Sequence, residues 1–342
     1  MSDCAASYDR ARPYDGLLLD LDGTLYRGAE VIDGAPAAVA RVRERGDVVR
    51  FVTNNAARTA EDVVARLRNA GFAADTHEVY TSSYAAAQLL AQRLAPAAKV
   101  LVLGTDALAG MVGDVGLRPV RQAAHGVAAV VQGHDPDTGW RELAEACVAV
   151  REGAWWLVCN TDATLPSERG ELPGNGAMAA VLRTATGVHP TVAGKPQAAS
   201  LLLAATSAGW QRPLVVGDRL ETDIAGAHEA GMDSLLVLSG VSTPLGLLQA
   251  PEGQRPTYIG SDVGALSGSL SDCEIVGNPA EDLGWHVVVG TSEVVVSSSS
   301  RAGTRLMLLR RLCPVAWSSG VSATRGADET ARATLTELGL SA

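Results

Sequence analysis

The sequence is poor in aromatic residues and in cysteines. Only 4% of its 342 residues are aromatic, so alanine, valine and leucine must fill most of the core. The five cysteines are widely spaced, form no C-x-x-C pair and are odd in number. This pattern indicates neither a disulfide framework nor a zinc site, and we expect buried or incidental thiols instead.

Long apolar runs are also missing from the chain. No stretch reaches the roughly 18 uninterrupted apolar residues of a membrane span. Residues 1–15 contain no apolar segment of the kind that signal peptides carry. We therefore expect a cytoplasmic protein that has no membrane partner.

Positive charge is scarce, and the formal net charge of the chain is −10. Proteins that bind nucleic acids normally present a basic face, so we expect no nucleic-acid partner. Any phosphate group that this protein binds must therefore be held by a few local charges.

The composition, 47% hydrophobic and 19% charged, is that of a globular protein, and the length allows two domains. One stretch stands out, GLLLDLDGTLYRG at residues 16–28. Its leucine run is too short for a helix and favours a strand buried on both faces of a parallel sheet. Asp20 and Asp22 then fall at the carboxyl end of that strand, where open α/β sheets bind ligands.

The carboxylates of Asp20 and Asp22 are one residue apart, so on an extended backbone their side chains point in opposite directions. Two anions this close are unfavourable unless a cation or a proton lies between them. Mg²⁺, which prefers oxygen ligands, is a common cation in such a place. The segment from Asp20 to Thr24 is also compatible with an acidic β-turn, so the rest of the chain must decide.

Helices and strands alternate after this segment, as in a parallel α/β sheet. A strand at 48–52 completes a right-handed βαβ unit, which brings Thr53 to the same edge of the sheet as Asp20. Similar patterns predict strands at 78–81, 214–216 and 234–238, and helices at 36–45, 60–70 and 223–231 and before Ala208.

A second α/β pattern occupies residues 82–186, a length typical of one domain. Its apolar periodicity predicts strands at 100–103, 127–132 and 155–159, and helices at 138–151 and 176–184. The first pattern resumes only after this insert.

The chain changes character after Gly240. Residues 243–268 are rich in proline, glycine and serine. β-Branched runs at 285–289 and 293–296 predict strands, and helical patterns follow at 305–312 and 328–338. This tail is either a small appended α+β module or an elaboration packed on the core, and its sequence shows no chemistry.

Polar residues follow several of the predicted strands: Asp20 with Asp22, then Thr53 and Asp218, while Lys195 lies in a glycine-flanked loop. A phosphoryl group gives them a common purpose, because its transfer needs an attacking oxygen, charge neutralisation and an acid for the leaving group. Asp20 is the candidate nucleophile and Asp22 the candidate acid/base. Lys195 would neutralise phosphate oxygens and Asp218 would complete a Mg²⁺ site.

Four motifs resemble those of the haloacid dehalogenase superfamily: DLDGT at 20–24, TNN at 53–55, GKP at 194–196 and GDRLETDI at 217–224. The long insert before Lys195 is similar to the C2-capped branch, which includes NagD-type, 4-nitrophenyl-phosphate, phosphoglycolate and glycerol-3-phosphate phosphatases. The resemblance, which spans residues 14–256, implies a Rossmann-like core at 14–81 and 187–260 and an α/β cap at 82–186. A C-terminal α+β extension of unknown role, 261–342, lies outside it.

The resemblance also implies roles for single residues. Asp20, the Asp22 carbonyl and Asp218 would hold Mg²⁺, with Asp223 in support. Thr53, the backbone of Asn54 and Lys195 would hold the phosphate.

Two further candidates lie in the insert, in a segment similar to the cap loop that faces the active site in this branch. Asn160 and Asp162 could contact the part of the substrate beyond its phosphate. An ordinary polar turn explains the same residues, so both interpretations stay open.

Together these features predict a Mg²⁺-dependent phosphatase that acts on a small phosphorylated metabolite through an aspartyl-phosphate. Resemblance to actinobacterial members favours glycerol 3-phosphate as the substrate. Phosphoglycolate, pyridoxal phosphate, a nucleotide and an acceptor other than water remain alternatives. A non-enzymatic phospho-accepting receiver domain is another, although it would need neither the insert nor the second acid. Relatives in the branch often dimerise through the cap, so we expect a homodimer.

Overall fold

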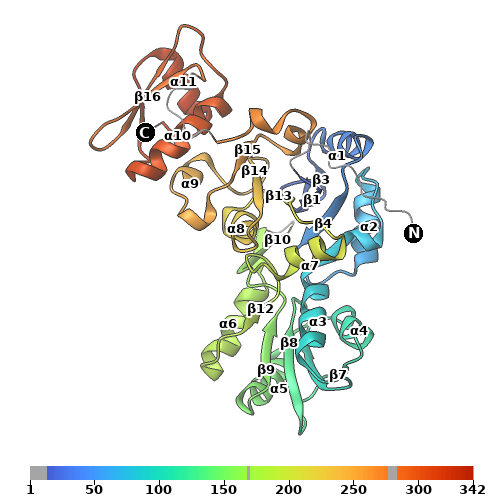
Figure 1. Ribbon diagram of the computed structural model, residues 1–342. Helices are drawn as coiled ribbons and strands as arrows, with labels where there is room; N and C mark the ends of the chain where they lie inside the picture. Colours follow the sequence, from blue (N-terminus) through green and yellow to red (C-terminus); the bar gives the residue numbers. More distant parts are fainter. Residues whose placement is uncertain (1–13, 168–169, 276–282, 342) are drawn as a thin grey trace.

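A parallel sheet lies at the centre of the molecule, which is described by a computed structural model for residues 14–167, 170–275 and 283–341. Its six strands have the order β15-β14-β13-β1-β4-β5 (Figure 1). They are β1 (Gly16–Leu19), β4 (Val49–Thr53), β5 (Val79–Thr81), β13 (Pro213–Gly217), β14 (Asp233–Val237) and β15 (Tyr258–Gly260). Every neighbouring pair is parallel, which confirms the predicted Rossmann-like core.

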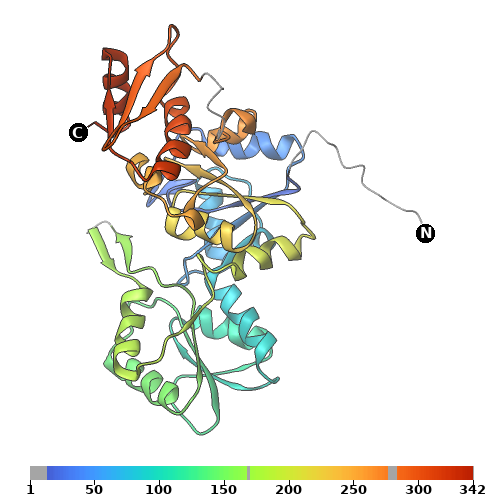
Figure 2. The ribbon, with the colours of Figure 1, turned by 60° about the vertical axis from the view of Figure 1, so that its left-hand side comes forward.

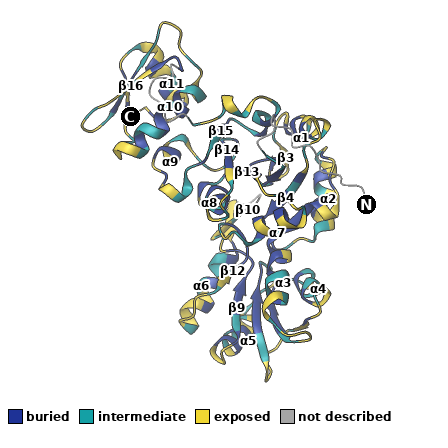
Figure 3. Cartoon of the chain, viewed as in Figure 1, coloured by how far each residue is buried: buried dark blue, intermediate teal, exposed yellow. Residues whose placement is uncertain are grey.

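Strand β1 is buried on both faces, as its leucine run predicted. Leu17 and Leu19 join an apolar cluster with α1 (Ala35–Glu44) and α2 (Ala60–Asn69). Leu18 joins a different cluster with α7 (Ala199–Ser207) and α8 (Ala225–Glu229). Successive strand residues point to opposite faces, so helices on both sides exclude water from β1, and Figure 3 shows the dark, buried strands beneath partly exposed helices.

The insert forms a second sheet with the order β12-β9-β8-β6-β7, whose edge strand β12 lies beyond the insert's predicted end at residue 186. Its strands are β6 (Lys99–Leu103), β7 (Arg118–Val120), β8 (Val127–Gln132), β9 (Trp155–Val158) and β12 (Thr191–Val192), and its helices are α3 (Ser82–Arg93), α4 (Asp106–Asp114), α5 (Trp140–Arg151) and α6 (Asn175–Thr186). Figures 1 and 2 show this unit below the core sheet. Helix α3 packs in the insert's own apolar cluster through Ala85, Ala86 and Leu90.

Several elements of the insert were not predicted from the sequence. Helix α4 contains Gly110 and Gly113, which weaken any helical signal. The antiparallel hairpin of β10 (Thr164–Ser167) and β11 (Gly170–Pro173) contains prolines and glycine. Tertiary context therefore overrides local propensity in both segments.

The tail folds as an α+β unit, here called the C-terminal module, residues 283–341. Strands β16 (Trp285–Val289), β17 (Val294–Ser298) and β18 (Thr324–Gly326) form one sheet beside α10 (Arg305–Ser319) and α11 (Glu329–Glu337). Helix α10 continues through Pro314, past its predicted end, because Cys313 and Ala316 are buried along the same helix as Leu309 and Leu312. Apolar residues of the module and of the core share one cluster, which includes Trp285 and Ile259.

The region rich in proline, glycine and serine is more ordered than its composition indicates. It contains α9 (Pro244–Leu248) and the edge strand β15. Val263 and Leu266 follow and pack in the same cluster as α1. A three-residue strand is too short to show a pattern in the sequence.

Cysteines 147, 159, 273 and 313 are free in the structure, whereas Cys4 lies outside the described residues. Among the helices of the described ranges, none has the length and apolar character needed to cross a membrane.

Replacing Leu18, which is 0% exposed, with alanine removes contacts on the α7–α8 side of β1. We expect Leu18→Ala to lower the free energy of unfolding by about 2–5 kcal/mol, measured by urea denaturation. Leu202→Ala is the matched control, because Leu202 on α7 is 45% exposed, and we expect a change within about 0.5 kcal/mol. Equal losses in both variants would contradict the two-sided burial of β1.

Candidate active site

Three adjacent strands bring polar residues to one edge of the core sheet. Asp20 follows β1, Thr53 ends β4 and Asp218 follows β13, and these strands are direct neighbours. The Asp20 backbone N–H donates to the carbonyl of Val216 at 2.8 Å, so β1 and β13 stay paired up to the site. The Thr53 hydroxyl accepts from the Asn55 N–H at 3.1 Å, which leaves its own proton available to an anion.

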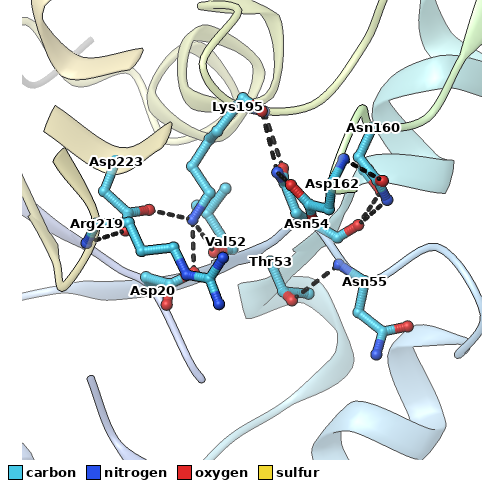
Figure 4. Close-up of polar contacts among 11 residues, drawn as sticks. Asp20, Val52, Thr53, Asn54, Asn55, Asn160, Asp162, Lys195, Arg219 and Asp223 are labelled. Carbon is cyan, nitrogen blue, oxygen red and sulfur yellow. Dashed lines mark hydrogen bonds and ion pairs between the residues drawn. The ribbon is translucent and has the colours of Figure 1, made fainter. Parts of the chain in front are cut away.

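Lys195 reaches this edge from the loop between β12 and α7 (Figure 4). Its Nζ donates to Asp20 Oδ1 at 2.5 Å, to Asp223 Oδ1 at 2.6 Å and to the Val52 carbonyl at 3.1 Å. The side chain is only 2% exposed. Burial alone would lower the pKa of Lys195, but the carboxylates of Asp20 and Asp223 outweigh burial and raise it. Lys195 is therefore a fixed positive charge.

One lysine does not balance the acids around it. The carboxylate oxygens of Asp20, Asp218 and Asp223 include a set that lies within 4.8 Å of one another. Burial raises the pKa of Asp20 well above its usual range despite Lys195, and repulsion from Asp223 and Asp218 adds to this. Burial, with repulsion from Asp223, also raises the pKa of Asp218 to about 6. The cluster therefore contains more carboxylates than positive charges to balance them.

Asp218 shows where a cation fits. It is fully buried; its Oδ2 accepts from the Val241 N–H at 2.7 Å, while its Oδ1 has no hydrogen-bond partner among the described residues. A buried carboxylate oxygen of this kind costs free energy unless a ligand meets it. The donors are all oxygens, as Mg²⁺ prefers, so these residues fit that ion.

Two glycines pack directly against Asp218. A Cβ on Gly23, which has a φ of +91°, would lie 2.3 Å from Asp218 Oδ2, and one on Gly240 would lie 1.9 Å from it. No other residue fits at either position without displacing the carboxylate. The glycine of the DLDGT motif therefore provides space for Asp218 as well as a turn.

Asp22 faces the same pocket but has a different neighbour, Arg66 on α2. Arg66 Nη2 lies 3.6 Å from Asp22 Oδ1, and the Asp22 side chain is 40% exposed. The Arg66 guanidinium lies 4.0 Å from the centre of the Tyr26 ring and donates to the Gly28 carbonyl. Burial raises the pKa of Asp22, and Arg66 opposes that shift. Arg66 thus connects the acid to the β2–β3 hairpin (Tyr26–Arg27 and Glu30–Val31).

The side chain of Asn54 holds the Lys195 loop in place. Its Oδ1 accepts from the Lys195 N–H at 2.9 Å, and its Nδ2 donates to the Lys195 carbonyl at 3.0 Å (Figure 4). The resemblance assigned a role to the backbone of Asn54 and none to this side chain. The paired amide contacts join residues 141 positions apart in the chain.

The insert meets the core at Asn54 as well. Asn160 Nδ2 donates to the Asn54 carbonyl at 2.7 Å, and Asn160 Oδ1 accepts from the Asp162 N–H at 3.2 Å. Asn54 Nδ2 lies 3.3 Å from Asp162 Oδ1, to which it donates. Asn160 is 4% exposed, and its side-chain amide is used in these two hydrogen bonds within the protein. Burial raises the pKa of Asp162 at the pocket wall.

These residues surround a pocket of about 330 Å³ between the core sheet and the insert. All the predicted site residues except Asp218 line it. Sequence reasoning missed four basic lining residues: Arg58, Arg66, His134 and Arg219. Arg219 lies inside the GDRLETDI motif, which could have identified it, whereas no local pattern marks the others.

Two models of one family of hydrolases match the parts of the chain that form this site. Residues 17–118 match the haloacid dehalogenase-like hydrolase model, and residues 192–266 match a HAD-hydrolase-like model. Residues 283–340 match a GCN5-related N-acetyltransferase like domain. The chain belongs to the haloacid dehalogenase-like hydrolases.

Individual relatives narrow the class further. The chain is 48% identical over 289 residues to the D-glycerol 3-phosphate phosphatase of Mycobacterium tuberculosis, covering 84% of this chain and 80% of that one. It is 38% identical over 233 residues to the 5'-nucleotidase YutF of Bacillus subtilis, covering 68% and 90% respectively. With the site described above, these relatives make the protein a phosphoric monoester hydrolase.

Solved structures of phosphatases are also similar to this chain. The M. tuberculosis glycerol phosphate phosphatase in complex with magnesium superposes with a TM-score of 0.91 at 44% identity, covering 96% of this chain and 98% of that chain. The p-nitrophenyl phosphatase from Archaeoglobus fulgidus gives a TM-score of 0.69 at 27% identity, covering 75% and 99%.

Replacing Gly240 with alanine tests the close packing around Asp218. We expect Gly240→Ala to displace the carboxylate and weaken Mg²⁺ binding by about 10–100-fold, as changes next to metal ligands commonly do, measured by titration calorimetry without substrate. Gly253→Ala is the control, because the nearest atom to its Cβ would lie 3.7 Å away. Unchanged Mg²⁺ affinity in Gly240→Ala would contradict a metal-binding role for Asp218.

Proposed function

We propose that the protein hydrolyses glycerol 3-phosphate to glycerol and inorganic phosphate with Mg²⁺ as its cofactor. The observation that carries this proposal is the buried cluster in which Lys195 joins Asp20 and Asp223 beside Asp218, because it combines a nucleophile, a fixed cation and metal ligands. The choice of substrate rests on the 48% identity to the M. tuberculosis enzyme.

In the proposed mechanism Asp20 attacks phosphorus, forms an aspartyl-phosphate and displaces the glycerol oxygen. Asp22 gives its proton to that oxygen and later takes a proton from the attacking water, which releases phosphate and restores Asp20. Thr53, the backbone of Asn54 and Lys195 hold the phosphoryl oxygens.

The metal ligands in this proposal are Asp20, the Asp22 carbonyl and Asp218, with Asp223 in support. When bound, Mg²⁺ neutralises charge on the phosphoryl oxygens and on the acids. The unpartnered Oδ1 of buried Asp218 supports this assignment.

We further propose that residues 14–81 and 187–260 act as a core, residues 82–186 as a cap, and residues 261–342 as a C-terminal extension. Hydrogen bonds from Asn54 to Asp162 and from Asn160 to Asn54 support closure of the cap on the core. Asp162, at the pocket wall, is suited to accept a hydrogen bond from a substrate hydroxyl, while Asn160 positions it.

Cytoplasmic location, a homodimer formed through the cap, and the absence of nucleic-acid and membrane partners are also part of the proposal. The net charge of −10 supports the lack of a nucleic-acid partner. Light scattering from the purified chain tests the dimer, and a monomer at micromolar concentration would overturn it.

A nucleotide is the second candidate substrate, because the B. subtilis relative is a 5'-nucleotidase. Phosphoglycolate and pyridoxal phosphate belong in the same comparison. A receiver-like domain is disfavoured, because the pocket contains the second acid, Asp22, and is walled by the insert.

Phosphate release from a panel of these phosphomonoesters, with and without Mg²⁺, tests the function. We expect the highest kcat/KM for glycerol 3-phosphate, and we expect Asp20→Asn to lower it by roughly three orders of magnitude or more, because the amide is a poor nucleophile. Release that needs no Mg²⁺, or an undiminished Asp20→Asn variant, would overturn the mechanism. A higher kcat/KM for a nucleotide would overturn only the substrate.

Removing Arg66 tests its contact with Asp22. We expect Arg66→Ala to lower kcat/KM for glycerol 3-phosphate by about tenfold or more, since a misplaced acid protonates the alkoxide poorly. The effect on 4-nitrophenyl phosphate should be much smaller, because nitrophenolate leaves with little help from an acid. Arg68→Ala is the control on the same helix, since Arg68 pairs with Asp75 instead. An equal loss with both substrates would contradict a role through Asp22.

A further inference from the structure

The C-terminal module contributes no residue to the active-site pocket, whose lining residues all lie between positions 20 and 223. Its helix α10 nevertheless packs against α9 and β15 of the core. A segment between β14 and the end of α9, residues 239–248, connects the two regions and is here called the strap.

The first part of the strap is bonded to the metal-site residues. The Val241 N–H donates to Asp218 Oδ2 at 2.7 Å, and the Ser242 N–H donates to the Asp218 carbonyl at 3.1 Å. Ser242 Oγ accepts from the Leu220 N–H at 3.0 Å. Together with the close approach of Gly240, these contacts leave the Asp218 carboxylate little freedom of position.

The strap also holds the DLDGT turn and the hairpin that follows it. Ser239 Oγ donates to the Gly23 carbonyl at 2.8 Å. Arg27 Nε, on the β2–β3 hairpin, donates to the Ser239 carbonyl. The strap therefore forms hydrogen bonds with both acidic motifs of the site, DLDGT and GDRLETDI.

The last part of the strap is α9, which lies against the C-terminal module (Figure 1). Trp317 Nε1 on α10 donates to the Leu247 carbonyl at 2.9 Å. That carbonyl lies in the last turn of α9 and also accepts from the Ala250 N–H at 3.2 Å, so the indole adds a second hydrogen bond that comes from the module. Leu247 and Leu248 are 0% and 3% exposed and share an apolar cluster with Leu308 of α10.

The same cluster reaches the loop that carries the acids. Leu220, between Asp218 and Asp223, and Ile224, directly after Asp223, are 4% and 0% exposed and belong to it. The module thus supports the metal-site loop in two ways, through the strap and through continuous apolar packing.

We propose that the C-terminal module is a positioning element for the metal site, which acts on Asp218 through the strap. This inference rests on the proposed Mg²⁺ site. Fixed ligands bind a metal more tightly than mobile ones, because less conformational freedom is lost on binding. The module raises Mg²⁺ affinity without touching the ion or the substrate.

The test uses the full chain with Trp317→Phe, which removes the Nε1 donor and keeps a ring, and Trp317→Ala, which removes both. We expect the Mg²⁺ dissociation constant, measured by calorimetry without substrate, to rise several-fold in the first and about tenfold in the second. Hydrogen exchange of the strap amides should become faster in the same order, with exchange of the insert's sheet unchanged.

Trp140→Phe is the matched control, since Trp140 on α5 is 80% exposed, and both readouts should stay at wild-type values. If Trp317→Ala fails to fold, Trp317→Phe carries the test alone. Wild-type Mg²⁺ affinity and wild-type strap exchange in Trp317→Phe would overturn the inference. A wild-type protein that binds no Mg²⁺ would instead overturn the proposed metal site, and this inference with it.

Discussion

The ammonium of Lys195, buried between Asp20 and Asp223, is the interaction on which the site depends. A buried cation is costly unless anions surround it, and here two carboxylates bond to Lys195 while a third, that of Asp218, lies beside them. Oδ1 of the buried Asp218 has no hydrogen-bond partner in the part of the chain that the structure describes. The carboxylates at this edge outnumber the buried lysine, and a divalent cation would offset the excess negative charge.

Asn54 binds the Lys195 backbone from outside the lysine's own loop. One asparagine side chain binds both backbone groups of Lys195, contacts Asp162, and offers its backbone carbonyl to Asn160. One residue of the TNN motif, Asn54, thus contacts both the insert and the backbone of Lys195.

The metal-site loop has a comparable support on its other side. One end of the strap donates a hydrogen bond to Asp218, and the other end accepts one from the Trp317 indole. The C-terminal module, which has no residue in the pocket, is therefore linked to the metal-site residues through the strap. The module matches an N-acetyltransferase like domain, and it contacts the core through a shared apolar cluster and the Trp317 hydrogen bond. Likeness in fold does not carry activity with it, because activity depends on the residues of a site.

The parallel core and the insert can be predicted from the sequence alone, as can the meeting of Asp20, Asp22, Thr53, Lys195 and Asp218 at one edge of the core sheet. Apolar runs and glycine-flanked turns are local, and parallel strands must end at one edge. Three contacts become visible only in the folded chain: the Asn54 side chain holds Lys195, Arg66 reaches Asp22, and Trp317 bonds to the strap. These contacts join residues between 44 and 141 positions apart. A hydrogen bond across such a separation leaves no period or spacing in the sequence, since it exists only once packing has fixed both partners.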